Sequence, residues 1–370
     1  MHLILYVNYY LPLLVHDTEQ FTLETFMSTT KKIPYSILEL ATVPAGTSHH
    51  QVFKNSLDLA QKAEKWGYTR FWLAEHHNMI SIASTATSVL IGHIAGGTNE
   101  IRVGSGGIML PNHSPLLVAE QFGTLGSLFP GRIDLGLGRA PGTDQVTAQA
   151  IRPDRMNSVY HFPEEVAQIQ QYFSVDNKTA PVRATVAEGV DVPLYILGSS
   201  TDSAHVAAKL GLPYAFASHF APDQLFDALQ IYYTNFQPSQ YLETPYTIAC
   251  INVIAADTAH EAEKISTSLV RMMLGVLTNK RDYIQPPDEP NEEMRELIQN
   301  PAFQRMFKYA FIGDKEIVKD KTNQFLKETG VNELMVASHT YHHADRLKSY
   351  QLFAEVMMEM SYESQTKAIS

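Results

Sequence analysis

The chain has 370 residues, of which 45% are hydrophobic and 18% are charged, and its formal net charge at pH 7 is -11. This composition excludes a disordered or collagen-like chain and provides apolar side chains for a large core. The acidic balance argues against nucleic acid or an anionic membrane as partner, because both need clusters of lysine and arginine. A single cysteine, Cys250, excludes a disulfide framework and a thiolate zinc site, and it predicts a reducing, cytoplasmic environment.

The first 32 residues differ from the rest of the chain. Their apolar segments at 3–7 and 11–15 are too short and interrupted to cross a membrane, and no lysine or arginine precedes them. A weak signal peptide or anchor is the alternative. Because Met27 is followed by Ser-Thr-Thr-Lys-Lys, a natural amino terminus, we expect translation to start there. Residues 1–32 are thus interpreted as an extension, absent in large part from the native protein, before one barrel domain at 33–370.

From Ile33 onward, patterns of buried strands alternate with patterns of helical periodicity. Such alternation is typical of parallel βαβ units, and about eight pairs predict a (β/α)8 TIM barrel with its active site at the carboxyl ends of the strands. The predicted strands span 35–42, 70–74, 101–104, 132–137, 193–198, 213–217, 246–254 and 333–337. The predicted helices span 50–66, 83–95, 114–128, 160–173, 201–210, 222–235, 257–275 and 343–359.

Two stretches do not fit the repeat and are interpreted as insertions after strands 4 and 7. They span 141–159 and 279–301, and both are long, charged and marked by proline. Such segments on a barrel act as lids or form solvated excursions. We interpret the second as a mobile cover for the barrel mouth, with a plain surface insertion as the alternative.

The second predicted strand ends abruptly in Glu75, His76 and His77 after a buried apolar run. A neutral histidine can move a proton near pH 7 and Glu75 can orient it, so His76 and Glu75 are candidate catalytic residues. A metal site is the alternative. The histidines considered as further ligands lie at 49, 50, 113, 161, 342 and 343. They do not form the spaced His/Glu pattern of a metal-binding helix, so we predict no metal.

The glycine-rich run Gly104-Ser105-Gly106-Gly107 ends the third predicted strand. Because glycine lacks a Cβ, the main chain there can approach a flat ligand or adopt torsion angles that strain other residues. The fourth predicted strand delivers Arg139 to a loop, where a permanently charged guanidinium favours an anion. Turn chemistry for the glycines and a solvated surface charge for the arginine are the alternative interpretations.

Hydroxyl groups crowd the start of the helix that follows the fifth predicted strand, at Ser199, Ser200 and Ser203. Free backbone N–H groups, the helix dipole and hydroxyl donors together make a phosphate cradle. Plain N-capping needs only one such residue and is the alternative. With the glycine platform and Arg139 on the same rim, the pattern suits a phosphorylated planar cofactor.

These segments resemble the luciferase-like, flavin-dependent monooxygenases, especially a bacterial group of uncharacterised single-subunit members. The resemblance runs from about Ile33 to the carboxyl terminus. It rests on FWLAEHHNM, VGSGGIMLPNHSPLLVAEQFGTLGSLFPGRIDLGLGRAPGTD and YILGSSTDSAHVAAKLGLPYAFASHF. It implies that reduced FMN, supplied by a separate flavin reductase, is used with O2 to oxygenate a small organic substrate.

The resemblance also implies roles for individual residues. His76 matches the family's catalytic histidine, and Gly106 and Gly107 match a non-proline cis peptide bond against the flavin ring. Ala41, at the end of the first strand, matches a residue near that ring. The positions that hold the flavin phosphate correspond to Arg139, Ser199, Ser200 and Ser203.

The sequence departs from true luciferases in ways that bear on the reaction. Glycines replace familiar alanines, and Ser199 stands where an acidic residue is familiar, so light emission with a long-chain aldehyde is not expected. The glycine run is too short for the GxGxxG nicotinamide fingerprint. Three alternatives stay open: a flavin-binding protein without turnover, a deazaflavin-dependent hydride-transfer enzyme, and a metal-dependent barrel hydrolase using His76 and His77.

The predicted helix at 83–95 contains almost no charge, although the outer helices of a barrel normally show a polar face to water. Burial under an insertion is one interpretation. We favour a homodimer interface, which the family resemblance also implies.

Overall fold

Eight parallel strands close into a barrel at the centre of the computed structural model, which describes residues 32–369. The strands pair in the order β6-β5-β4-β3-β2-β1-β9-β7, and pairing of β6 with β7 closes the ring. Their bounds are β1 (Tyr35–Glu39), β2 (Arg70–Leu73), β3 (Arg102–Met109), β4 (Ile133–Gly138), β5 (Leu194–Gly198), β6 (Tyr214–Phe216), β7 (Thr247–Ala255) and β9 (Glu333–Ala337). The predicted (β/α)8 barrel is confirmed.

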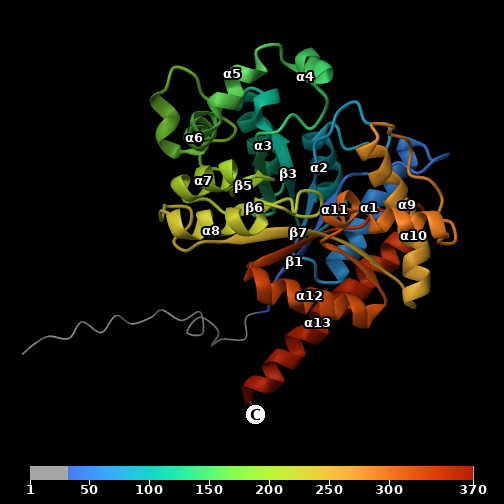
Figure 1. Cartoon of the computed structure of the whole chain (residues 1–370). Helices are drawn as coiled ribbons and strands as arrows, with labels where there is room; N and C mark the ends of the chain where they lie inside the picture. The colour runs from blue at the N-terminus through green and yellow to red at the C-terminus, as the bar shows by residue number, and fades with distance from the viewer. Residues whose placement is uncertain (1–31, 370) are drawn as a thin grey trace, which may run out of the picture.

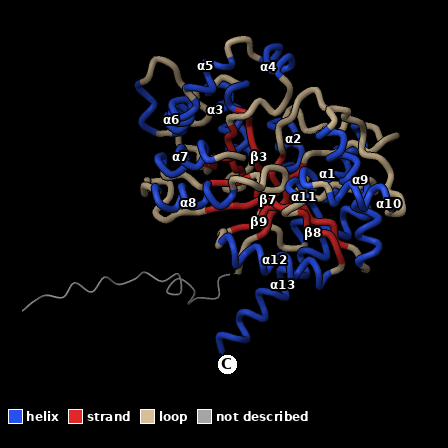
Figure 2. The backbone as a smooth tube through the Cα atoms, in the orientation of Figure 1, coloured by secondary structure: helices blue, strands red, loops and turns tan. Residues whose placement is uncertain are grey.

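Helices surround the barrel on its outside, as Figures 1 and 2 show. The apolar faces of most of them pack on the strands in one large core, and α9 to α11 share a second cluster. Their bounds are α1 (His49–Lys65), α2 (Thr87–Gly96), α3 (Pro115–Leu128), α4 (Gln145–Ile151), α5 (Arg155–Tyr160), α6 (Phe162–Phe173), α7 (Thr201–Leu210), α8 (Leu225–Asn235), α9 (Ala259–Leu277), α10 (Glu292–Gln299), α11 (Pro301–Met306), α12 (Lys315–Thr329) and α13 (His343–Ile369). Met27 and the proposed start of translation lie outside the described residues.

The prediction that glycines end the third strand is wrong, because β3 continues through them to Met109. A Cβ on Gly104 would lie 2.5 Å from the carbonyl oxygen of Asp134, and one on Gly136 would lie 2.2 Å from that of Ser105. The glycines therefore allow β3 and β4 to pack more closely than side chains would permit. The pairing of the two strands shifts in register between Ser105 and Ile108.

Strand β8 and five helices, α4, α5, α10, α11 and α12, were not predicted. Strand β8 (Ala310–Gly313) pairs with the second half of β7 outside the closed ring, and α12 follows it. Asp314 caps α12 by accepting a hydrogen bond from the Ile317 amide, and Gly330 ends it in the left-handed conformation. The helix has few apolar side chains, because half of its buried positions are threonine, and this weakens its periodic signal.

Additional elements follow β4 and β7, where the insertions were expected. The 141–159 stretch contains α4 and most of α5, and the 279–301 stretch contains α10. Helix α2 begins at Thr87 and not at residue 83, because the preceding chain is held against the β1 loop. There, Ala83 donates its N–H to the carbonyl of Ala41, and Thr42 pairs with Ile82.

A buried ion cluster fills the amino-terminal end of the barrel. Arg70 donates hydrogen bonds to Glu333 at 2.8 and 3.0 Å, to Asp134 at 2.8 Å and to the Tyr195 hydroxyl at 2.8 Å. Glu333 also accepts from Tyr246 at 2.6 Å. Each charge of this cluster has several partners, which offsets the cost of removing it from water.

Candidate functional site

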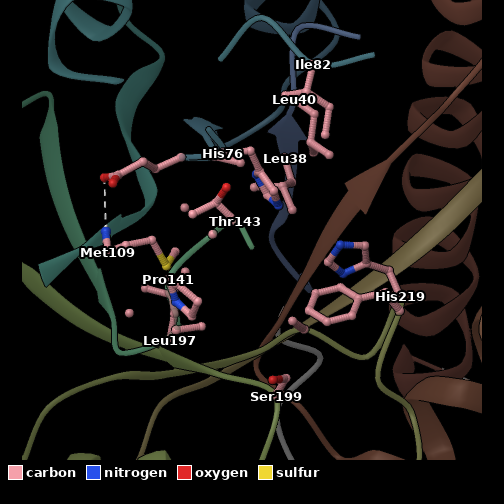
Figure 3. Close-up of a pocket in the computed structure, with 18 of the residues that line it drawn as sticks. Leu38, Leu40, His76, Ile82, Met109, Pro141, Thr143, Leu197, Ser199 and His219 are labelled. Carbon is pink, nitrogen blue, oxygen red and sulfur yellow. Dashed lines mark hydrogen bonds between the residues drawn. The ribbon is translucent and has the colours of Figure 1, made fainter. Parts of the chain in front are cut away.

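A cavity of about 1030 Å³ opens at the carboxyl ends of the barrel strands. Figure 3 shows part of its wall, with His76, Met109, Leu197 and His219 around a common hollow. The structure brings seven of the predicted site residues into this wall: Glu75, His76, Gly106, Arg139, Ser199, Ser200 and Ser203. Segments that lie more than 100 residues apart therefore meet at one site.

Two predicted residues, Ala41 and Gly107, lie behind the cavity wall and do not line it. Ala41 is fully buried with φ 51°, and its N–H donates to the Glu39 carboxylate at 3.0 Å. Glu39 in turn pairs with Arg346 at 3.1 Å. Ala41 thus belongs to the structure that supports the rim.

The peptide bond between Gly106 and Gly107 is cis. A Cβ on Gly106 would lie 2.6 Å from the Leu38 side chain, and a Cβ on Gly107 would lie 2.6 Å from the carbonyl oxygen of Gly136. Packing against the main chain therefore requires glycine at 107, whereas a side chain at 106 would have to displace Leu38. Of these two glycines, Gly106 lines the cavity and Gly107 does not.

Glu75 does not orient His76, contrary to our interpretation of the sequence. Successive residues of an extended chain point in opposite directions. The Glu75 carboxylate accepts hydrogen bonds from His77 at 2.9 Å, from His113 at 2.9 Å and from the Met109 amide at 3.0 Å, the last of which is drawn in Figure 3. Glu75 therefore ties the end of β2 to the end of β3.

The ionisation of Glu75 follows from this environment. Burial alone would raise the pKa of the carboxyl, but hydrogen bonds from His113, His77 and the Met109 amide lower the pKa to about 2. Glu75 is thus a fixed negative charge at neutral pH, and it serves as an anchor for the two strand ends and not as a proton donor.

His76 is half-buried in the cavity wall, and its main-chain N–H donates to Ser84 at 3.0 Å. Burial lowers the pKa of its imidazole to about 4, and the nearby charge of Glu75 only partly opposes this effect. Its Nδ1 is buried without a hydrogen-bond partner. The ring is therefore uncharged at pH 7 and available to a ligand.

Two further histidines of the cavity, His219 and His339, were missed by the sequence analysis. They follow β6 and β9 and are 6% and 3% exposed. Burial lowers the pKa of His219 to about 3 and that of His339 to about 4. The sequence contains a pattern that could have identified these two histidines. The tripeptide Ala-Ser-His occurs at the end of both strands, at 217–219 and 337–339.

The predicted phosphate cradle lies at the first turn of α7. Its N-cap, Ser200, makes no side-chain capping bond, and the hydroxyls of Ser199 and Ser200 contact no hydrogen-bonding group within residues 32–369. Ser203 is different, because its hydroxyl donates to the Ser200 carbonyl at 2.9 Å and contacts the Tyr214 hydroxyl at 3.1 Å. Ser199 and Ser200 are thus the hydroxyl donors left for a ligand.

Arg139 directly follows β4, as predicted, and its guanidinium forms an ion pair with Asp202 at 2.6 Å. Asp202 is the second residue of α7, so a carboxylate already stands beside the free N–H groups of that helix. Arg139 is therefore a half-exposed cation whose charge is partly neutralised before any ligand binds.

Arg155 was not predicted, yet it lines the same side of the cavity and is only 8% exposed. It donates to the Asn112 side chain at 2.8 Å and to the main-chain carbonyl of Arg139 at 2.7 Å, and it makes no ion pair within the described chain. Burial lowers the pKa of this guanidinium. The nearby charge of Glu75 partly opposes this effect. A buried cation that is hydrogen-bonded only to neutral acceptors suits an anionic ligand.

The 279–301 segment contributes Lys280, Arg281, Asp282, Tyr283 and Gln285 to the cavity wall. It is held to the barrel by Ile284, which is 1% exposed and exchanges hydrogen bonds with the β1 loop. The segment therefore covers part of the mouth. Its predicted mobility stays a prediction.

Within residues 32–369, no group of three histidine, cysteine or acidic side chains is arranged to hold a metal ion. The three cavity histidines come from three different strand ends and do not converge on a common point at metal-ligand distance. Over the same residues, no helix is both long and apolar enough to cross a bilayer.

Comparison with known proteins identifies the family. The family model of luciferase-like monooxygenases matches residues 33–351. The chain belongs to the luciferase-like monooxygenase family. It is 46% identical to "Luciferase-like monooxygenase" of Escherichia coli K12, over 90% of this chain and 99% of the relative. It is 48% identical to the protein YvbT of Bacillus subtilis, over 87% and 96%.

A more distant relative and three solved structures complete the comparison. N-acetyl-S-alkylcysteine monooxygenase of Bacillus subtilis is 32% identical over 88% of this chain and 98% of its own. The crystal structure of apo-MsnO8 aligns with a TM-score of 0.79 at 33% identity, covering 88% of this chain and 98% of that one. An FMN complex of a diketocamphane monooxygenase and an F420-dependent alcohol dehydrogenase share the fold at 17% and 16% identity, with TM-scores of 0.66 and 0.63.

Proposed function

We propose that the protein uses reduced FMN and O2 to oxygenate a small organic substrate. The observation that carries this proposal is the composition of one cavity. Free hydroxyls and a buried guanidinium stand on one side, and an uncharged imidazole stands at the end of β2. Family membership supports oxygenation, and the choice of FMN over a deazaflavin is part of the proposal.

The anion site fits the phosphate of FMN. Arg155 keeps N–H groups free for a ligand, and Ser199 and Ser200 add hydroxyl donors beside the N-terminus of α7. Arg139 supplies a second guanidinium, shared with Asp202. Ser203 would support the site without contacting the phosphate. Its hydroxyl donates to the Ser200 carbonyl and so fixes the shape of the turn.

The ring of the flavin would lie across the main chain at Gly106, between Leu38 and Leu197 of the cavity wall. When bound, the reduced flavin supplies the electrons and the activation of O2. His76, uncharged at neutral pH, accepts a proton at a free ring nitrogen and returns it. The surrounding apolar side chains exclude water from this pocket.

Reconstitution tests this function. The purified protein should bind FMN and, when a separate reductase supplies reduced FMN, should incorporate oxygen into a metabolite detected by mass spectrometry. Tight FMN binding without product across a broad metabolite screen would indicate a flavin-binding protein without turnover. Preferential binding of a deazaflavin with no oxygen uptake would indicate hydride transfer. A need for such a reductase partner and a cytoplasmic location stay predictions.

We also propose that the protein forms a homodimer through α2 and α3. Helix α2 carries no lysine, arginine or acidic residue. Val89 on α2 is 70% exposed, and Leu117 and Leu128 on α3 are 54% and 64% exposed. Because the two helices are neighbours, these side chains form an apolar surface on a single chain. Light scattering should give twice the mass of one chain, and replacing Val89 by arginine should give a monomer.

A further inference from the structure

The cavity contains more unsatisfied polar atoms than a flavin phosphate explains. His76, His219 and His339 all line it, from three different strand ends, and the last two are more than nine-tenths buried. Within residues 32–369, none of their six ring nitrogens donates or accepts a hydrogen bond, and each Nδ1 is fully buried. Native proteins satisfy the great majority of buried polar atoms, so a group of this kind points to a ligand.

No protein group fixes the tautomer of these rings. An imidazole whose second nitrogen has no partner can carry its proton on either nitrogen, so it can turn a donor toward an acceptor ligand. Figure 3 shows the rings of His76 and His219 turned toward the same hollow. His76 and His219 can therefore each offer an N–H donor to a group in this hollow.

Two cations without an ion-pair partner in residues 32–369 lie at the mouth of the cavity. The buried histidines His219 and His339 form its floor. Lys280 and Arg281 line the cavity, and neither side chain makes an ion pair or hydrogen bond within the described chain. Asp282 also lines the cavity, and its carboxylate accepts hydrogen bonds from the Tyr283 amide at 2.7 Å and from the Gln285 side chain at 3.1 Å. Arg281 lies close enough to His76 to affect the ionisation of that ring. A protein of net charge -11 thus presents free cations at its cavity mouth.

This positive charge is separate from the phosphate cradle. The cradle is built at the ends of β4 and β5, whereas the segment carrying Arg281 is fixed to the β1 loop through Ile284. In the closed order of strands, β1 lies opposite β4 and β5. One phosphate cannot occupy both places. The cavity volume of about 1030 Å³, at the upper end of the range for ligand sites, leaves room for a second molecule.

We propose that Arg281, His219 and His339 form a carboxylate-binding subsite and that the substrate is a small organic acid. Arg281 supplies the countercharge at the rim, and the two histidines donate hydrogen bonds from the floor. His76 stands beside them, next to the position proposed for the flavin. The apolar part of the substrate packs on side chains such as Leu40, Met79 and Ile82 of the same wall. This inference rests on the proposed function, because it assigns the substrate of that site.

Matched acids and esters test the subsite. The enzyme loaded with oxidised FMN is titrated with N-acetyl-S-benzylcysteine, 4-phenylbutanoate and octanoate, and with the methyl ester of each, while flavin fluorescence and heat are recorded. At least one acid should bind about tenfold or more tightly than its ester. Equal binding of every acid and its ester, or binding of no acid, overturns the proposal.

Variants then locate the contact. Arg281→Gln should weaken binding of the acid by about tenfold and change ester binding by less than about twofold. His219→Gln and His339→Gln should each weaken acid binding by several-fold. Arg305→Gln and His205→Gln, at exposed positions of α11 and α7, are the matched controls and should bind the acid like the parent protein. An unchanged acid affinity in Arg281→Gln overturns the assignment even if the parent prefers acids.

The same titrations separate this inference from the proposed function. Affinity for FMN is measured first, for the parent and for each variant. A parent that does not bind FMN contradicts the proposed function, and the acid and ester titrations are then read by heat alone. Loss of FMN affinity in Arg281→Gln, with no loss of acid binding, would place this arginine at the phosphate and overturn the subsite.

Discussion

The two ends of the barrel treat buried polar side chains in opposite ways. At the amino-terminal end, Arg70, Asp134 and Glu333 are almost completely buried, and every charge has hydrogen-bonded partners. At the carboxyl end, His219 and Arg155 are also buried, but the His219 ring has no hydrogen-bond partner within residues 32–369, and the Arg155 guanidinium bonds only to neutral acceptors. Satisfied groups stabilise the fold, whereas unsatisfied ones cost stability, and we propose that they serve ligands.

We expect the largest loss of stability when one charge is removed from the cluster at the amino-terminal end of the barrel. Glu333→Ala leaves Arg70 buried with only Asp134 as a charged partner, and it should lower the free energy of unfolding by about 3–5 kcal/mol. Urea denaturation measures this change. Glu328→Ala, at an exposed position of α12, should cost less than about 0.5 kcal/mol. Similar losses in both variants would show that the cluster contributes no special stability.

The buried histidines at the carboxyl end of the barrel should make the free energy of unfolding depend on pH. The pKa values of His219 and His339 are about 3 and about 4 when folded, below the ordinary value of 6.5, because burial disfavours the charged ring. The unfolded chain therefore binds more protons between about pH 6.5 and 4. The free energy of unfolding is greatest above pH 6.5 and falls as the pH drops, by about 1.4 kcal/mol per pH unit for each ring.

Denaturation at pH 7.5, 6 and 5 tests this dependence. The double variant His219→Gln, His339→Gln should show a slope that is shallower by about 3 kcal/mol per pH unit. A slope equal to that of the parent would mean that other groups dominate acid destabilisation.

Removing the His76 imidazole, which we propose to be catalytic, should lower activity without lowering stability. His76→Ala should lower turnover with reduced FMN by about 100-fold or more, the usual scale for a lost acid or base. Its free energy of unfolding should change by less than about 1 kcal/mol, because the ring nitrogens have no protein partner to lose. Stopped-flow oxygenation kinetics measure the rate, with His205→Ala as control. Unchanged kinetics would remove His76 from the reaction.

The smallest of these effects concerns the two arginines of the anion site. Arg155→Ala should weaken FMN binding by about 1.5–3 kcal/mol, because its buried charge has no carboxylate partner. Arg139→Ala should cost about 1–2 kcal/mol, because Asp202 already shares its charge and water screens it. Fluorescence titration with FMN compares the two. An equal or larger loss for Arg139 would contradict this order.

Local patterns predicted the eight strands of the barrel and most of its helices. Hydrophobic periodicity is strong where a strand or helix buries one face, so β2, β4 and α3 were placed within one or two residues. The same rule failed for α12, whose buried positions include threonines, and for the glycines of β3, which resemble a turn in sequence. In those places close packing decided the conformation.

The sequence by itself determined that residues such as His76, Arg139 and Ser199 stand at strand ends, because chain position fixes that. Only the tertiary structure decided what each side chain faces. It turned Glu75 away from His76 toward His113, committed Ser203 to Tyr214, and brought in Arg155 and His339. The physical reason is that hydrogen-bond partners and burial depend on contacts between distant segments, and these exist only after the barrel closes.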